Sequence, residues 1–213
     1  QEDVNDMNLL VRDYQIKMIN ENMPRNPSIS GTPYLTNDYA SSKIFFRNQE
    51  KALNVKLRYN AYSGEFEFIR NGQRFVIANK EDLDSIRHIG YSFMYTSYRD
   101  ESGRLREDFL ARLVDDSCSL YKLYVADFHE AEPPKTGYDK AKPARFEMED
   151  PGYCLKLEDQ SYPQKIASYR RGRFLNRFGD LEKELKQYIR DQNIRLYQEE
   201  DLIRFVKHYN RNY

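Results

Sequence analysis

The densest group of chemically capable side chains in this sequence is a basic cluster near the C-terminus. Its members are Lys165, Tyr169, Arg170, Arg171, Arg173 and Arg177. The stretch 165–213 carries 12 Lys and Arg against 7 Asp and Glu, so the region is locally basic. Cations interleaved with aromatic rings are typical of polyanion binding. The cluster is our candidate binding site, and the alternative explanation is a solvated helix surface.

Carboxylates offer a second kind of chemistry, because two of them in a cleft can act as general acid and base. Asp115 and Asp116 are adjacent, and Glu67 lies on an expected strand. Arginines surround Glu67 in that strand pairing, which favours ion pairs over acid–base work. A hydrolase is therefore the alternative function, and we assign no catalytic residue.

Motifs for metals, nucleotides and covalent catalysis are missing. The histidines, His88, His129 and His208, lie far apart without metal-ligand spacing. The nine glycines are scattered singly, so no phosphate-binding loop is visible, and there is no GxSxG nucleophile motif. We expect no cofactor and no metal.

The charge balance argues against a global electrostatic partner. Lys and Arg number 34 and Asp and Glu number 34, so no overall field steers the chain toward nucleic acid, which we do not expect as a partner. No apolar run approaches the roughly 18 to 20 residues of a membrane helix. Cys118 and Cys154 could form one disulfide or remain two buried thiols, and the sequence leaves both open.

The most regular run is 54–79, which predicts three antiparallel strands. Asn71-Gly72 is a strong hairpin signal, since a type I′ turn needs positive φ at both central residues. Ser63-Gly64 is a second candidate turn. Two-residue turns at both places fix the register of all three strands.

This register places Phe68 opposite Phe75 and Tyr59 opposite Phe68. The side chains that then share a core face are Leu57, Tyr59, Ala61, Phe66, Phe68, Phe75 and Ile77. The opposite face carries Lys56, Arg58, Asn60, Glu67, Ile69, Arg74 and Val76, and we expect it to be solvated and charge-paired.

Alternating segments elsewhere predict further strands. One runs over 85–98, and a hairpin around Asp115-Asp116 pairs Leu113 with Cys118 and Ala111 with Leu120, which buries Cys118. Four prolines among the charges between His129 and Pro151 predict a long surface loop.

Helical spacing marks both ends of the chain. A short helix is expected over 6–20, followed by a proline-rich connector from Pro24 to Thr36. From Pro163 onward the period lengthens to about 3.6. Two apolar stripes result, one of Leu181, Leu185, Tyr188 and Ile189, the other of Leu202, Phe205, Val206 and Tyr209.

The predicted architecture is a single α+β domain. An N-terminal helix and connector occupy 1–30, an antiparallel β-meander sheet occupies 31–162, and helices over 163–213 pack on that sheet.

Several segments resemble a widespread group of uncharacterised exported proteins of Bacteroidetes. They are GTPYLTNDYA, the LRYNAYSGEFEF hairpin with its Arg58-Tyr59-Asn60 strand, FLARLVDDSCSLYKLY, and the tail from FLNRFGDLEKELKQYIRDQ to FVKHYN. The resemblance covers roughly residues 31–210 and implies removal of an export signal, consistent with Gln1 as a mature start, and a periplasmic or extracellular location. It implies no catalytic residue.

These observations lead to one functional expectation. We expect a non-catalytic envelope or periplasmic module that binds a ligand or another protein, with an envelope protein or glycan as partner. The alternatives are a hydrolase acting on envelope polymers and a polyanion binder using the Lys165–Arg177 cluster.

Overall fold

The computed structural model of this chain describes residues 16–18, 29–134 and 142–213. It is a mostly β fold with C-terminal helices packed on a sheet, so the α+β class is confirmed in this coarse form. Within the described residues, no helix is both long enough and apolar enough to cross a membrane.

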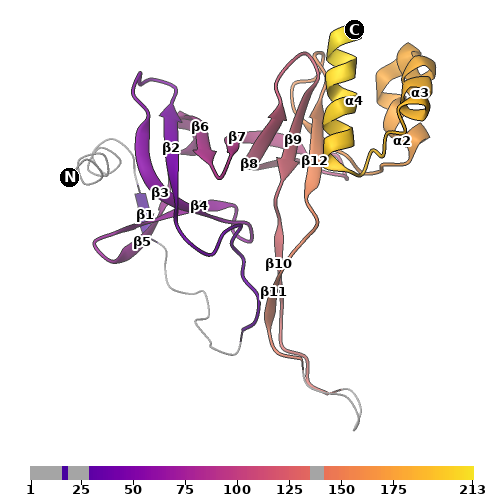
Figure 1. Cartoon of the computed structure of the whole chain (residues 1–213). Coiled ribbons are helices and arrows are strands. Elements are labelled where there is room, and N and C mark those ends of the chain that lie inside the picture. The colour runs from indigo at the N-terminus through magenta and orange to yellow at the C-terminus, as the bar shows by residue number, and fades with distance from the viewer. Residues whose placement is uncertain (1–15, 19–28, 135–141) are drawn as a thin grey trace. The chain divides into compact units, whose positions relative to one another are not determined.

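The chain divides into two compact units, whose elements are labelled in Figure 1. Unit 1 comprises Gln1–Tyr95 and Tyr124–Pro151, and unit 2 comprises Thr96–Leu123 and Gly152–Tyr213. Strand β7 (Tyr91–Arg99) begins in unit 1 and ends in unit 2.

Unit 1 contains a sheet in which neighbouring strands are antiparallel. In sheet order these are β1 (Ile16–Met18), β5 (Gln73–Ile77), β4 (Glu65–Arg70), β3 (Leu53–Asn60), β2 (Ala40–Phe46), β6 (Leu83–His88) and the start of β7. The 3-10 helix η1 (Lys80–Asp82) precedes β6, and β10 (Ala126–His129) pairs with β11 (Arg145–Met148) in a separate ribbon. The sheet as a whole is not a meander, because β2 lies beside β6.

The hairpin of β4 and β5 has the predicted register. Phe68 lies opposite Phe75, and Arg70 lies opposite Gln73. The turn residues Asn71-Gly72 have φ values of 50° and 74°. Left-handed backbone at both positions is what a type I′ turn requires, so the sequence signal and the geometry agree.

The turn between β3 and β4 differs from the prediction. Tyr59 lies opposite Phe66 instead of Phe68, because four residues, not two, connect the strands. The Asn60 side chain stabilises this longer turn, since its Oδ1 accepts hydrogen bonds from the backbone N–H groups of Tyr62 and Ser63 at 3.1 and 3.2 Å. A shift by two residues keeps every side chain on its predicted face.

Aromatic rings fill the core of unit 1. Of the seven side chains predicted to share the core face, six are buried and Phe75 is half-buried. The ring centroids of Tyr59 and Phe66 lie 4.9 Å apart, and those of Phe66 and Phe93 lie 5.2 Å apart. Such contacts stabilise a core beyond simple area burial.

The opposite face of β3 and β4 is more buried than predicted. Arg58 Nη2 lies 3.2 Å from Glu67 Oε2, and Asn60 donates to Glu67 Oε1 at 3.0 Å. Tyr34 covers this group, because it forms a β-bridge with Asn60 and the guanidinium carbon of Arg58 lies 3.4 Å from the centre of the Tyr34 ring. Glu67 is only 2% exposed as a result.

Two predicted segments fall partly outside the described residues. Of the helix expected over 6–20, the structure describes Ile16–Met18, and these residues form strand β1 beside β5. The loop expected between His129 and Pro151 contains β11, and its residues 135–141 are not described. Pairing with β10 overrides the weak local pattern in β11.

Unit 2 is built on five strands whose pairing closes on itself. In order these are the end of β7, β13 (Gln164–Lys165), β12 (Gly152–Lys156), β9 (Ser119–Leu123) and β8 (Leu105–Val114), which pairs again with β7. The β13–β7 pair is parallel, so this sheet is not purely antiparallel. Residues just after Pro163 thus form a strand, and helix begins later than predicted.

The hairpin of β8 and β9 has a different register from the predicted one. Ala111 lies opposite Lys122 instead of Leu120. A bulge between Arg112 and Val114 changes the pairing closer to the turn. Counting residue pairs outward from the turn cannot detect an extra residue in one of the two strands.

Both thiols are buried and free. Cys118 and Cys154 form no disulfide, which decides between the two possibilities left open by the sequence. Burial raises the pKa of each thiol to about 12. Both therefore stay protonated and unreactive at neutral pH.

The helices of unit 2 share one apolar core with its strands. They are α2 (Arg171–Leu175), the 3-10 helix η2 (Asn176–Leu181), α3 (Glu182–Asp191) and α4 (Glu199–Asn212). The two predicted stripes pack against this core, with Leu185, Ile189 and Phe205 fully or almost fully buried among residues of β8, β9 and β12. The Asn210 amide group fixes α4 to the β8–β9 turn through hydrogen bonds of 2.8 and 2.9 Å to the Cys118 backbone.

Candidate functional site

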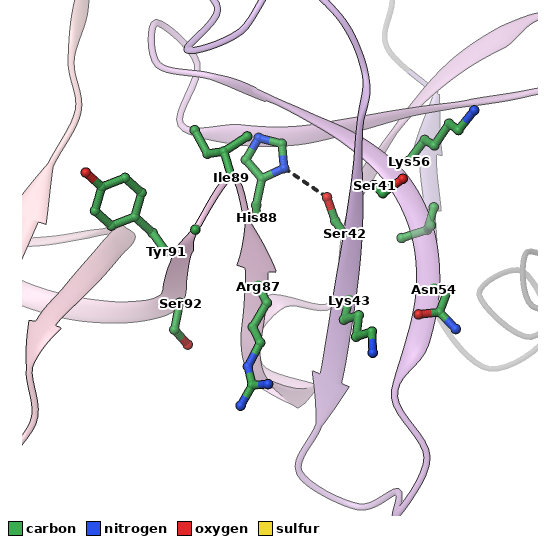
Figure 2. A pocket seen from close by; sticks show the side chains of 12 residues that line it. Ser41, Ser42, Lys43, Asn54, Lys56, Arg87, His88, Ile89, Tyr91 and Ser92 are labelled. Carbon is green, nitrogen blue, oxygen red and sulfur yellow. Dashed lines mark hydrogen bonds between the residues drawn. The ribbon is translucent and has the colours of Figure 1, made fainter.

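Unit 1 has an open hollow of about 610 Å³, shown in Figure 2. Residues of β2, β3 and the hairpin of β6 and β7 line it. Three exposed cations are among them, Lys43 from β2, Lys56 from β3 and Arg87 from β6. We call this site the cationic hollow.

Strand pairing places the three cations on one face of the sheet. Lys43 lies directly opposite Arg87 on one side and Asn54 on the other, and Ser41 lies opposite Lys56. Directly opposed residues share a face, and so do residues two apart on a strand. Figure 2 shows Lys43 and Arg87 extending in the same direction from β2 and β6.

The positive charge of the hollow has no counterion in the described part of the chain. None of the described carboxylates forms an ion pair with Lys43, Lys56 or Arg87. Arg87 instead lies over the Phe45 ring, 4.9 Å from its centre. Like charges directly opposite each other destabilise a strand pair. An anion between Lys43 and Arg87 would relieve that repulsion.

Ser42 and His88 form a buried pair at the same place. Ser42 Oγ lies 2.9 Å from His88 Nδ1 and donates to the Ala40 carbonyl oxygen at 2.9 Å. A hydroxyl whose proton points to Ala40 must accept from His88, so Nδ1 carries a proton and cannot act as a base toward Ser42. Burial also lowers the pKa of His88 to about 4. The pair therefore holds β6 against β2 and lacks the arrangement of a nucleophile and its base.

Low pH is expected to lower the free energy of unfolding of unit 1, because His88 becomes protonated. The pKa is about 4 in the fold against an ordinary value of 6.5, so the unfolded chain binds the proton more readily. The contribution of this group to stability is present above the ordinary pKa and is lost as the pH falls toward the folded pKa. At about pH 5 the loss in the free energy of unfolding should be roughly 2 kcal/mol.

A titrating and a non-titrating side chain can be compared to check this. The variant His88→Phe keeps an aromatic ring beside Phe66 and Phe93 but removes the titrating group. Urea denaturation at a series of pH values should show a shallower decline below about pH 6.5 for the variant. Parallel declines in the two proteins would contradict the assignment to His88.

A strained turn forms one end of the hollow. Ile89 and Gly90 have φ values of 44° and 86°, as the central residues of a type I′ turn between β6 and β7. The predicted single strand over 85–98 is therefore broken here. Positive φ is a genuine outlier for a β-branched residue, which is why the sequence of this turn gives no hairpin signal apart from its glycine.

Two cations of the sequence-predicted cluster have partners inside unit 2. Lys165 Nζ lies 3.2 Å from Glu101 Oε1. Arg177 donates from Nε to the Phe174 carbonyl oxygen at 2.9 Å, and burial lowers its pKa. These two side chains stabilise the unit in which they lie.

The other members of that cluster lie on or just before α2. Arg170, Arg171 and Arg173 are exposed. The Tyr169 ring packs edge-on against Tyr153 at a centroid distance of 6.4 Å, so it is part of the packing of unit 2. Three neighbouring arginines thus remain as an exposed basic surface on unit 2.

The carboxylates considered for hydrolysis have structural partners as well. Glu67 is held by Arg58 and Asn60. Asp115 pairs with Arg112 at 2.7 Å, and Asp116 accepts the Ser117 N–H at 2.8 Å. In the stretches 29–134 and 142–213, no three or more His, Cys, Asp or Glu side chains gather in a way that could hold a metal ion.

Comparison of the chain with protein-family models, curated proteins and solved structures found no match. The function is therefore inferred from the geometry of the cationic hollow.

Proposed function

We propose that this chain is a non-catalytic binding module and that the cationic hollow of unit 1 binds an anionic ligand. Lys43 and Arg87 hold the anion between them, and Lys56 on the neighbouring strand provides a third positive charge. The observation that carries the proposal is the direct opposition of Lys43 and Arg87 without a described counterion. Two opposed cations do not stabilise the fold by themselves, whereas an anion bound between them would stabilise it.

The setting of the cations supports binding more than catalysis. They project from paired strands, so their backbone positions are fixed before a ligand arrives, and little ordering opposes binding. Polar groups of Ser41, Asn54 and Ser92 also line the hollow and can donate hydrogen bonds to anionic oxygens. The buried pair beside them is not poised as a nucleophile and base.

Removal of the three charges tests the proposal. The triple variant Lys43→Gln, Lys56→Gln, Arg87→Gln is expected to bind inorganic phosphate and heparin roughly 100-fold more weakly, because hydrogen bonds to charged groups are each worth tenfold or more. Isothermal titration at low salt measures both affinities. Raising the salt concentration should weaken binding by the parent protein more steeply than binding by the variant.

A matched control removes equal charge elsewhere. The variant Arg170→Gln, Arg171→Gln, Arg173→Gln also loses three exposed cations, but from unit 2. Its affinities should stay within about threefold of the parent. Loss of heparin binding in this control alone would favour the sequence-predicted polyanion site and contradict the cationic hollow.

The cellular setting is a separate part of the proposal. The resemblance to exported proteins supports a periplasmic or extracellular location, where an anionic envelope glycan could be the ligand. Fractionation of cells that express the full-length protein tests this location. Recovery in the cytoplasm would contradict it without affecting the proposal for the hollow.

A further inference from the structure

The cationic hollow has an apolar end beside its charged one. Figure 2 shows Ile89 at the tip of the hairpin, next to His88, and Tyr91 on the following strand. Ile89 lines the hollow with Lys43 and Arg87 and is half-buried, so part of its side chain remains accessible. Tyr91 lies opposite His88, and its ring packs against Phe93 and Tyr124, so Tyr91 belongs to the core face of the sheet.

The backbone conformation of Ile89 indicates that its side chain has a role in binding. Its φ of 44° lies in the left-handed region, which a β-branched residue rarely adopts. Asparagine or glycine at this position of a type I′ turn avoids the strain, and Asn71 has that role in the hairpin of β4 and β5. Strained residues of this kind cluster at ligand clamps, where the side chain serves binding and not folding.

We infer that the ligand of the cationic hollow carries an apolar ring or short apolar group attached to its anionic group. The anionic group lies between Lys43 and Arg87, and the apolar group rests on Ile89. This inference rests on the proposed function and adds the chemical class of the ligand. It also explains why isoleucine occupies a position that the turn disfavours.

A single substitution separates folding from binding. Ile89→Asn relieves the backbone strain, so the melting temperature should rise by roughly 2 to 4 °C. The same change removes apolar surface from the hollow. The parent protein should bind phenyl phosphate roughly tenfold more tightly than inorganic phosphate, and this preference should fall to about threefold or less in the variant.

Inorganic phosphate and a second isoleucine provide the controls. Affinity for inorganic phosphate should be unchanged in Ile89→Asn, because the charged end is intact. Ile69→Asn makes the same chemical change at an isoleucine that is 46% exposed and does not line the hollow. That variant should keep the full preference for phenyl phosphate.

The outcomes distinguish the two proposals. Equal affinities of the parent for both phosphates, or an unchanged preference in Ile89→Asn, would overturn the inference while inorganic phosphate binding still supports the proposed function. Failure of the parent to bind either compound would overturn both. A higher melting temperature together with a reduced preference is the result that supports the inference.

Discussion

Replacing Glu67 with leucine is expected to lower the free energy of unfolding of unit 1 by about 3 to 5 kcal/mol. The Glu67 side chain is 3% exposed, and it neutralises Arg58, whose side chain is 14% exposed. Its loss leaves the guanidinium without a counterion beneath the Tyr34 ring, and Asn60 loses the acceptor for its amide. An uncompensated buried charge is among the few changes that destabilise a protein this strongly.

A double variant shows whether the stranded charge is the cause. Arg58→Met with Glu67→Leu removes both charges and should recover most of the stability lost in the single variant. Urea denaturation followed by hydrogen exchange of the β3 and β4 amides measures the effect where it arises. A single variant that loses less than about 1 kcal/mol would show that the ion pair contributes little.

Replacing Phe174 with alanine is expected to destabilise unit 2 by about 3 to 5 kcal/mol. Phe174 is 0% exposed, and its ring centroid lies 5.2 Å from that of Phe205 and 5.8 Å from that of Phe178. Truncation opens a cavity where α2, η2 and α4 meet, and it removes the ring contacts that join these helices. Short helices such as α2 depend on this packing, because they are too short to be stable alone.

Circular dichroism of the helices gives the readout, since α2, α3 and α4 belong to unit 2. The control is Tyr197→Ala, because Tyr197 is 63% exposed, and a change of no more than about 0.5 kcal/mol is expected there. Similar unfolding midpoints for Phe174→Ala and the parent protein would argue against a shared helix core.

The parts of the fold that sequence predicts well are those that local chemistry decides. Asn71-Gly72 forces one turn geometry, so the register of β4 and β5 follows from it. The β3–β4 turn is different, because the Asn60 side chain stabilises a four-residue connection that a Ser-Gly signal does not reveal. The helical stripes around Leu185 and Phe205 are similarly predictable, since their spacing alone selects the buried face.

Pairings between distant segments could not be predicted. β13 is two residues long and joins β7 in parallel, and no local pattern marks it. The bulge in β8 and the burial of Glu67 near Tyr34 also depend on contacts between remote parts of the chain. Such contacts decide which polar residues are buried. A prediction from polarity alone places these residues at the surface.

The candidate site also depends on a pairing between distant segments that the sequence does not predict. Sequence reading found Arg170, Arg171 and Arg173 because they are neighbours along the chain. Lys43 and Arg87 are 44 positions apart in the numbering and become neighbours only through the pairing of β2 with β6. That pairing skips three strands of the sequence, so no local count of charges could reveal it.

Backbone chemical shifts during a titration with inorganic phosphate test the binding account most directly. The largest changes are expected at Ser41, Lys43, Lys56, Arg87 and the Ile89–Ser92 segment, with saturation, and no comparable changes are expected in α2. Saturable changes confined to Arg170, Arg171 and Arg173, or no saturable change anywhere, would contradict it.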